Sequence, residues 1–417
     1  MKSIWAIIEY LQNPLLILVT TPIFLEMLGA KYFGLWALFL AAVSIGGYFS
    51  AGITQALTKT VAATHAEQYG ASYKKISSGA SLLVAANVGV LLVLIAIYFN
   101  VASKEDGFSE ETWAWFFIAL VLSVIFDQLD SIGVGFLRGL ERFSLAAKFE
   151  TLARIFQYAL CSALLIAGYG IDALFLAVSV FSFLRFSIRY FLLNKEVAKI
   201  SLWPSLHNAR SLAPLALWGF IQGIGYLLYN VFDRFIIAEQ LSYELLTAYS
   251  VSAQLTTQIH AVVSAGISVL FPMVSRLNAS GDISRISRRL FQIFLIISIM
   301  AGAATAILCI WGDLILWLWL DPQTSIEAAP ILSLLAISSF LQSLSIVPMF
   351  VLLGLGKAKK IAIVNICAGV LSFIIMSTFV SVLDVYGVLL GKFFYGLVLL
   401  YLNYLCAKEL GWIRSCP

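Results

Sequence analysis

Four charged side chains stand inside two apolar stretches, where a charge is costly and therefore informative. Asp127 and Asp130 lie three residues apart in one stretch, and Glu150 and Arg154 lie four residues apart in the next. These spacings place each pair on one face of a helix. Carboxylates and a guanidinium at such positions can form an ion pair, take up protons or bind a charged solute.

The polar turn Arg138–Arg142 joins the two stretches and predicts an antiparallel helical hairpin. Counted away from this turn, Asp127 and Arg154 lie at equal depth, about 15 Å from it at 1.5 Å per residue. That depth is near the middle of a hydrocarbon layer about 30 Å thick, where an ionised side chain must be paired or hydrated. Two interpretations stay open: a structural ion pair between the helices, or a polar cavity that both helices line.

The composition is that of an integral membrane protein. Of the 417 residues, 61% are hydrophobic and only 12% are charged, and the mean hydropathy is +0.96. Soluble domains of this length are far more polar. The five cysteines have no metal-binding or redox spacing and the three histidines lie far apart, so we expect no metal site and no cofactor.

Twelve apolar runs are long enough to cross a membrane as helices, which predicts an all-α integral membrane protein. The first run is too long for a signal peptide and no cleavage signal follows it, so we interpret it as the first span. The runs cover residues 4–28, 32–54, 79–100, 113–137, 144–168, 172–193, 212–238, 247–275, 290–318, 328–353, 361–383 and 387–407.

The lysines and arginines predict the orientation of the spans. With the N-terminus in the cytosol, 21 of the 26 fall on the cytosolic side, Arg185 and Arg189 among them, and two fall on the other side. The remaining three lie within the runs: Arg154, Arg234 and Lys392. Such a bias follows the positive-inside rule, and it predicts that both termini are cytosolic.

The two halves of the chain resemble one another in spacing and hydropathy. Aligning Gly139 with Gly354 gives an offset of 215, which also brings the starts of the second and eighth runs into register. This pattern predicts a duplication into an N-terminal six-helix lobe, residues 1–200, and a C-terminal six-helix lobe, residues 201–417. Repeats of the same orientation commonly place a substrate site between them.

The second half has its own charges within apolar runs. Asp233 and Arg234 are adjacent in run 212–238, and Lys392 lies in the last run. Neighbouring helical residues point about 100° apart, so Asp233 and Arg234 do not face one line. Two interpretations stay open: basic side chains that snorkel to the membrane surface, or charges contributed to a central cavity.

Two prolines interrupt the first run. Gln12 and Asn13 precede Pro14, and Thr20 and Thr21 precede Pro22. Proline removes a backbone hydrogen bond from a helix. We therefore expect a kink there, either static and satisfied by the threonine hydroxyls or bending during a transport cycle.

Several segments, in order along the chain, match the motifs of one family. They are LGAKYFGLWAL at 28–38 with GYFS at 47–50, FLRGLERF at 136–143, DRFII at 233–237 with Tyr249-Ser250, and LGLGKA at 353–358. Together they resemble the Wzx-type O-antigen flippases, bacterial polysaccharide exporters of the MATE-like MOP superfamily. The chain departs from the family in its first span, 4–28, where some relatives carry arginines. This span has no basic residue and contains Glu26 instead.

The resemblance implies two six-helix lobes around a central cavity that opens alternately to either side. The substrate would be an undecaprenyl-pyrophosphate-linked oligosaccharide, moved from the cytoplasmic to the periplasmic leaflet of the bacterial inner membrane. The protein would be a monomeric transporter and not an enzyme, would bind no nucleic acid, and would have other polysaccharide-assembly proteins as candidate partners.

The charged residues inside the runs then divide into two sets of expected roles. Substrate contacts are expected from the basic set: Arg154, Arg234 and Lys392. Ion coupling or charge pairing is expected from the acidic set: Asp127, Asp130, Glu150 and Asp233.

Two other functions are compatible with the composition. A MATE-like exporter of small cationic compounds needs a net acidic cavity, and the near balance of acidic and basic residues in the runs does not exclude one. A membrane O-antigen polymerase or ligase needs a sizeable outer loop with polar catalytic residues. The most polar loop expected on the outer side, Val101–Thr112, is short, which argues against such an enzyme.

Overall fold

The computed structural model describes residues 2–62, 69–101, 107–196, 200–267, 274 and 287–412. Within these residues every regular element is an α-helix and no strand occurs, which confirms the predicted all-α fold. The chain divides into two compact units, Met1–Ile224 and Gly225–Pro417. The division after Ile224 falls inside the helix Leu206–Asn230, which is C-terminal to the lobe boundary expected at residue 200.

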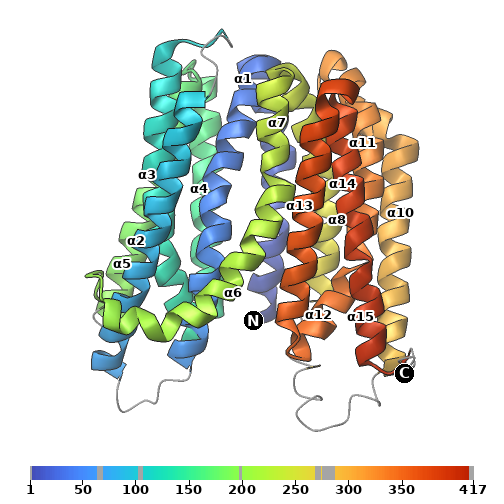
Figure 1. The fold of residues 1–417 in the computed structure, drawn as a ribbon. Helices are drawn as coiled ribbons and strands as arrows, with labels where there is room; N and C mark the ends of the chain where they lie inside the picture. The colour runs from blue at the N-terminus through green and yellow to red at the C-terminus, as the bar shows by residue number, and fades with distance from the viewer. Residues whose placement is uncertain are drawn as a thin grey trace. The chain divides into compact units, whose positions relative to one another are not determined.

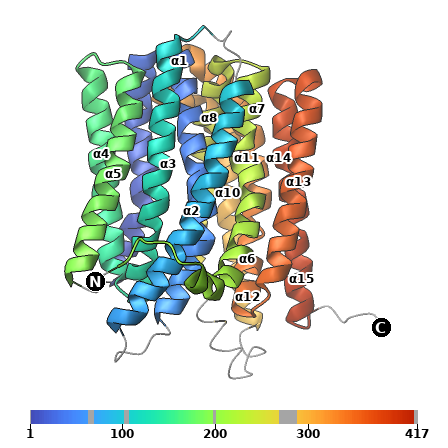
Figure 2. The same cartoon turned by 60° about the vertical axis from the view of Figure 1, so that its left-hand side comes forward.

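The first unit is built around α3, which packs against both α1 and α5 (Figure 1). Helix α4 contacts α1, α5 and α3. Because α3 also packs against α5, the helices α3, α4 and α5 lie next to one another, as Figure 2 also shows. The helices of this unit are α1 (Lys2–Ala62), α2 (Tyr69–Val101), α3 (Glu110–Gly139), α4 (Phe143–Ile166), α5 (Ile171–Glu196) and the first part of α6 (Leu206–Asn230).

The second unit is arranged around α11 and α14, which pack against each other. Helix α11 also contacts α8 and α10, and α14 packs along α13. The helices of this unit, after the end of α6, are α7 (Phe232–Gln240), α8 (Tyr243–Ile267), α10 (Ser287–Trp319), α11 (Pro322–Ser343), α12 (Ile346–Gly354), α13 (Ala358–Leu383), α14 (Val385–Leu399) and α15 (Tyr401–Glu409).

Helix α1 contains a break that lies away from the prolines. Its 61 residues are too many for one crossing, and Gly29 inside it has φ 73° and ψ 163°. The two predicted runs 4–28 and 32–54 therefore lie on either side of Gly29. The non-helical backbone dihedrals within α1 fall at Gly29 and not at Pro14 or Pro22, and Thr20 Oγ1 donates to the carbonyl of Leu16 at 2.8 Å. The kink at the prolines stays a prediction.

The helices are long and apolar enough for a multi-pass membrane protein. Nine described helical stretches could cross a membrane, or ten if the bent pair Leu206–Pro214 and Gly219–Gln240 forms one span. One of the nine, Leu15–Ala62, has 48 residues, which is room for two crossings. The eighth predicted run corresponds to α8, and its end beyond Ile267 lies outside the described residues apart from position 274.

The predicted hairpin between α3 and α4 is confirmed. Helix α3 ends at Gly139 and α4 begins at Phe143, so the turn falls within the predicted Arg138–Arg142 segment. The amide of Leu140 donates to the carbonyl of Phe136 at 2.9 Å, which closes the last turn of α3. At the other end of α3, Ser109 accepts a hydrogen bond from the amide of Thr112 at 3.1 Å and caps the helix.

The break in α1 predicts a backbone effect on stability. A positive φ with ψ near 163° is a region that essentially only glycine occupies, so Gly29→Ala should destabilise the protein by about 1–3 kcal/mol. No atom lies within 4 Å of a Cβ built at Gly29 or at Gly89 of α2, so a clash contributes at neither position. We expect Gly29→Ala to lower the thermal unfolding midpoint in detergent and Gly89→Ala to leave it unchanged or raise it. Equal midpoints for the two variants would contradict this reading of Gly29.

Candidate functional site

A cavity of about 480 Å³ lies within the first unit, bordered by α1, α3, α4 and α5. Hydroxyl and amide side chains from α1 and α3 contribute to its wall, including Ser50, Gln55 and Ser131. Its charged lining consists of four arginines and three carboxylates: Arg138, Arg154, Arg185, Arg189, Asp127, Asp130 and Glu150. A polar, charged hollow of this kind inside apolar helices is the strongest candidate site in the described part of the chain.

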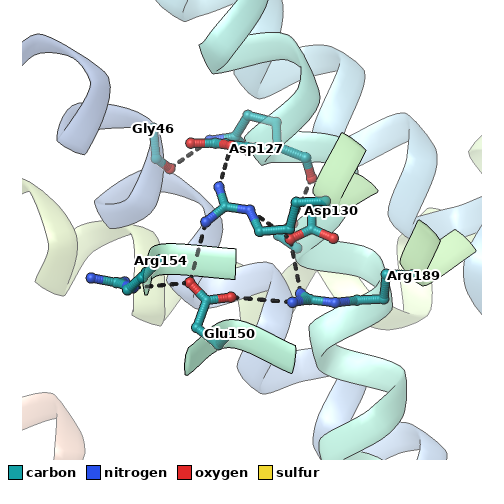
Figure 3. Close-up of polar contacts among 9 residues, drawn as sticks. Gly46, Asp127, Asp130, Glu150, Arg154 and Arg189 are labelled. Atoms are coloured by element: carbon teal, nitrogen blue, oxygen red, sulfur yellow. Dashed lines mark hydrogen bonds and ion pairs between the residues drawn. The ribbon is translucent and has the colours of Figure 1, made fainter. Parts of the chain in front are cut away.

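Glu150 on α4 is the centre of the charged network (Figure 3). Its Oε1 accepts from Arg154 Nε at 3.2 Å and from Arg185 Nη1 at 3.2 Å. Its Oε2 accepts from Arg189 Nη2 at 3.1 Å. One carboxylate therefore holds three guanidinium groups, one from its own helix and two from α5.

The two aspartates of α3 contact two of these arginines, Arg185 and Arg189, from the opposite side. Asp127 Oδ1 accepts from Arg185 Nη2 at 2.5 Å, and Asp130 Oδ2 accepts from Arg189 Nη1 at 2.8 Å. Asp130 Oδ2 also lies 3.5 Å from Arg185 Nε. Charge-assisted hydrogen bonds of this type are roughly twice as strong as neutral ones and fix the planes of the guanidinium groups.

The sequences of α3, α4 and α5 explain why these groups meet. Arg185 and Arg189 are four residues apart, so both project from one face of α5 toward α3 and α4. Gly133 makes room for the deeper arginine, because a Cβ at this position would lie 2.8 Å from Arg189 Cδ. The ring of Phe149 supports the same guanidinium from the α4 side, with Arg189 Cζ 4.8 Å from the ring centroid.

The solvent exposure of the charged side chains decreases across the network from Arg154 to Arg189. The Arg154 side chain is 40% exposed and that of Glu150 is 19% exposed, whereas Arg189 retains only 3%. The side chain of Asp130 is similarly buried. A solute entering the cavity would therefore meet Arg154 and Glu150 before it reached the charges behind them.

The structure brings together the four charges that opened the sequence argument. Asp127 and Arg154 contribute to one network and one cavity, as the equal-depth count predicted. The expected ion pair between the two helices of the hairpin is wrong in its partner, because Asp127 pairs with Arg185 of α5 and Arg154 pairs with Glu150 of its own helix. Asp127 and Arg154 both line the cavity, as the second interpretation expected.

Arg185 and Arg189 are the residues that the sequence argument missed. Assigning them to the cytosolic side was wrong, because they lie level with Asp127, Asp130 and Glu150 in the interior of the helices. Counting residues away from the α4–α5 turn could have found them. Helix α4 ends at 166 and α5 begins at 171, so residue 187, between Arg185 and Arg189, lies at the same depth as Glu150. Without these two, 19 basic residues remain on the cytosolic side against two, so the predicted orientation is unaffected.

A second cluster lies within the second unit and is closed to solvent. Lys392 Nζ lies 2.6 Å from Asp233 Oδ2, and both side chains are buried. Asp233 also accepts from Tyr249 Oη at 2.5 Å and from the amide of Arg234 at 2.8 Å. The snorkelling interpretation is wrong for Lys392, whose ammonium is enclosed by protein and lies 3.8 Å from the centroid of the Tyr229 ring.

A break between two helices explains why basic side chains gather here. Helix α6 ends at Asn230 and α7 begins at Phe232, so the carbonyls of the last turn of α6 need other donors. Lys392 Nζ donates to the carbonyl of Tyr229 at 2.5 Å, and Arg234 Nη1 donates to the carbonyl of Asn230 at 2.6 Å. Cations at a helix C-terminus are also favoured by the helix dipole.

Comparison with known proteins identifies the family. The sequence profile described as "Polysaccharide biosynthesis protein" matches residues 1–278, about two thirds of the chain. The chain belongs to this polysaccharide biosynthesis family. A second profile, described as MatE, matches residues 214–378. A Shigella flexneri protein described as a candidate O-antigen transporter is 22% identical over 409 residues, covering 93% of this chain and 92% of that protein.

Two solved transporter and flippase structures share the fold of this family member. A multidrug resistance MATE family transporter in an inward-facing conformation gives a TM-score of 0.71 at 15% identity, with 100% of both chains covered. The lipid II flippase MurJ in an inward closed conformation gives a TM-score of 0.75 at 15% identity, covering 96% of this chain and 87% of MurJ. The profile matches and the O-antigen transporter relative confirm the resemblance inferred from the sequence motifs, and with it the expectation of a transporter, while the solved structures show the shared fold.

The Lys392–Asp233 pair predicts a large effect of removing one partner. Lys392→Met removes the ammonium that faces the Asp233 carboxylate and donates to the Tyr229 carbonyl, and breaking a buried pair costs about 3–5 kcal/mol. We expect a lower thermal unfolding midpoint than for Lys357→Met, since Lys357 is a half-exposed partner of Glu409. The double variant Asp233→Asn with Lys392→Met should recover part of the lost stability, because it no longer has a buried carboxylate without its ammonium partner. A double variant less stable than Lys392→Met would refute this account of the pair.

Proposed function

We propose that this protein flips an undecaprenyl-pyrophosphate-linked oligosaccharide from the cytoplasmic to the periplasmic leaflet of the bacterial inner membrane. The observation that carries the proposal is the set of arginines that line a polar cavity within apolar helices. Family membership and the O-antigen transporter relative support a polysaccharide precursor as the cargo.

The chemistry of such a cargo matches the lining of the cavity. A diphosphate cannot cross hydrocarbon unaided, because each desolvated charge costs several kcal/mol. Guanidinium groups bind phosphate oxygens through paired N–H donors, and hydroxyl and amide side chains suit the sugar hydroxyls. The lipid tail can stay in the bilayer while the cavity carries the polar head group.

The roles of individual residues follow from their positions. We propose that Arg154, the most exposed of the three paired arginines, meets the diphosphate first and that Arg185 and Arg189 complete its binding. Arg234, which is partly exposed, is the proposed contact of the second lobe. Lys392 can contribute to binding only when its pairing with Asp233 opens.

The cycle that we propose is alternating access between two six-helix lobes, residues 1–200 and 201–417. Both termini would face the cytosol, the protein would work as a monomer, and other polysaccharide-assembly proteins would supply and receive the substrate. Asp127, Asp130 and Glu150 would pair the arginines between cycles or take up a coupling proton, because arginine itself stays charged.

The alternative of a small-cation exporter fits the cavity less well. Such a cavity should be net acidic, whereas the lining has four arginines against three carboxylates. Each carboxylate is also already paired with at least one guanidinium. The balance of charge therefore favours an anionic cargo.

The proposed role of Arg154 predicts a defect in cells. Cells that lack the protein should accumulate the lipid-linked oligosaccharide, and Arg154→Ala should fail to restore export while Arg154→Lys restores part of it. Loss of a charge-assisted contact should lower the export rate about tenfold or more. The matched control is Arg210→Ala, which removes an exposed arginine of α6 outside the cavity. Full rescue by normally expressed Arg154→Ala would remove Arg154 from the site.

Ion coupling predicts a dependence on the membrane gradients. In proteoliposomes, flipping of a fluorescent lipid-linked oligosaccharide should slow when the proton or the sodium gradient is collapsed with an ionophore. The carboxylates of the cavity are the groups able to take up a coupling ion. Unchanged flipping after both gradients are collapsed would show that transport is uncoupled.

A further inference from the structure

Glu150 differs from the other carboxylates of the cavity in how many cations it holds. It contacts Arg154, Arg185 and Arg189, at 3.1–3.2 Å in every case. Asp127, by contrast, is paired with Arg185 alone. The N–H donors of three guanidinium groups thus converge on the two oxygens of one side chain.

This convergence has the chemistry of a phosphate site that is already occupied by a carboxylate. Several guanidinium groups directed at one small anion are what proteins use to bind phosphate, because each offers two parallel N–H donors to neighbouring oxygens. A phosphate group could accept the same donors from the position of the Glu150 carboxylate. No other carboxylate in the described residues holds three arginines in this way.

We infer that Glu150 is an internal anion that takes the place of the substrate phosphate and is displaced when the lipid diphosphate binds. The inference rests on the proposed function. It adds how the arginines are compensated in the empty cavity and how the substrate is released. Glu150 is accessible enough to be displaced, since its side chain is 19% exposed and its neighbour Arg154 is 40% exposed.

The exchange has a clear electrostatic reason. Three guanidinium groups in an apolar setting must have a counter-charge at all times, because arginine does not lose its proton. Exchanging one anion for another keeps them compensated while the cavity is empty, while it is loaded and while the cargo leaves. Asp127 and Asp130 remain on the far side of Arg185 and Arg189 and keep the planes of these two guanidinium groups fixed during the exchange.

The consequence is that Glu150 weakens binding and assists release. A carboxylate that returns to the arginines competes with the phosphate, so the affinity for cargo is lower than three guanidinium groups alone would give. Removing its charge should therefore tighten binding, which is the opposite of what loss of a structural ion pair would do to a site.

The test is a binding measurement on the purified full-length chain in nanodiscs, with geranyl diphosphate as the probe. We expect Glu150→Gln to lower the Kd about tenfold, because the competing charge is gone while a side chain of similar size remains. Asp127→Asn removes the same charge from the same cavity but takes one partner from Arg185 alone, which keeps Glu150, so its effect should be clearly smaller. Glu409→Gln is the control outside the cavity, since Glu409 pairs with Lys357 and Lys360 in the second unit.

Glu150→Asp keeps the test informative if the glutamine variant does not fold. The shorter carboxylate cannot reach all three arginines, so it should bind the probe more tightly than the native chain without any change in net charge. Thermal unfolding midpoints establish that each variant is folded before its Kd is compared.

The outcomes separate the inference from the function on which it rests. If folded Glu150 variants bind geranyl diphosphate no more tightly than the native chain, the displaced-anion role is wrong while the proposed cargo stands. If Asp127→Asn tightens binding as much as Glu150→Gln, net charge alone is responsible and the inference is again wrong. If neither the native chain nor any variant binds the probe, the proposed diphosphate cargo fails, and the inference fails with it.

Discussion

The fold of the first unit depends on a balance of charge inside apolar helices. Arginine is a charged side chain in proteins. The helices around Arg154, Arg185 and Arg189 must therefore provide carboxylates at the same level. Helix α3 supplies two and α4 supplies one, and the arginines come from α4 and α5. The packing of three helices is thereby tied to one network, because a shift of any of them would leave a charge without a partner.

The charged side chains inside the helices have different surroundings in the two units. The first has an open network that borders a cavity, whereas the second has a buried pair that closes the break between α6 and α7. At the predicted repeat offset of 215, Asp127 and Glu150 correspond to the neutral Gln342 and Asn365. Asn365 accepts a hydrogen bond from Tyr395 Oη at 3.0 Å, so polar contacts replace ion pairs there. At these two positions only the first half has ionised groups.

Much of the architecture was predictable because hydropathy and turn residues are local signals. The apolar runs and the Arg138–Arg142 turn predicted the helices and the hairpin, and charge spacing identified four members of the network. The remaining members were misplaced for a physical reason. A count of basic residues treats every arginine near a helix end as solvated, and it has no means to recognise that Arg185 and Arg189 face carboxylates on two other helices. Likewise, the burial of Lys392 depends on the break after Asn230, which no pattern in the last run reveals.

The close approach of α5 to Gly133 has an evolutionary consequence. The space that Arg189 occupies is the space a side chain at position 133 would fill, with only 2.8 Å between the Cβ position and Arg189 Cδ. Glycine and arginine at these two positions are therefore a matched pair, and neither is easily exchanged alone. Among family members that have lost the arginine, we expect alanine or larger residues to appear at the glycine position, so the two columns of a family alignment should vary together.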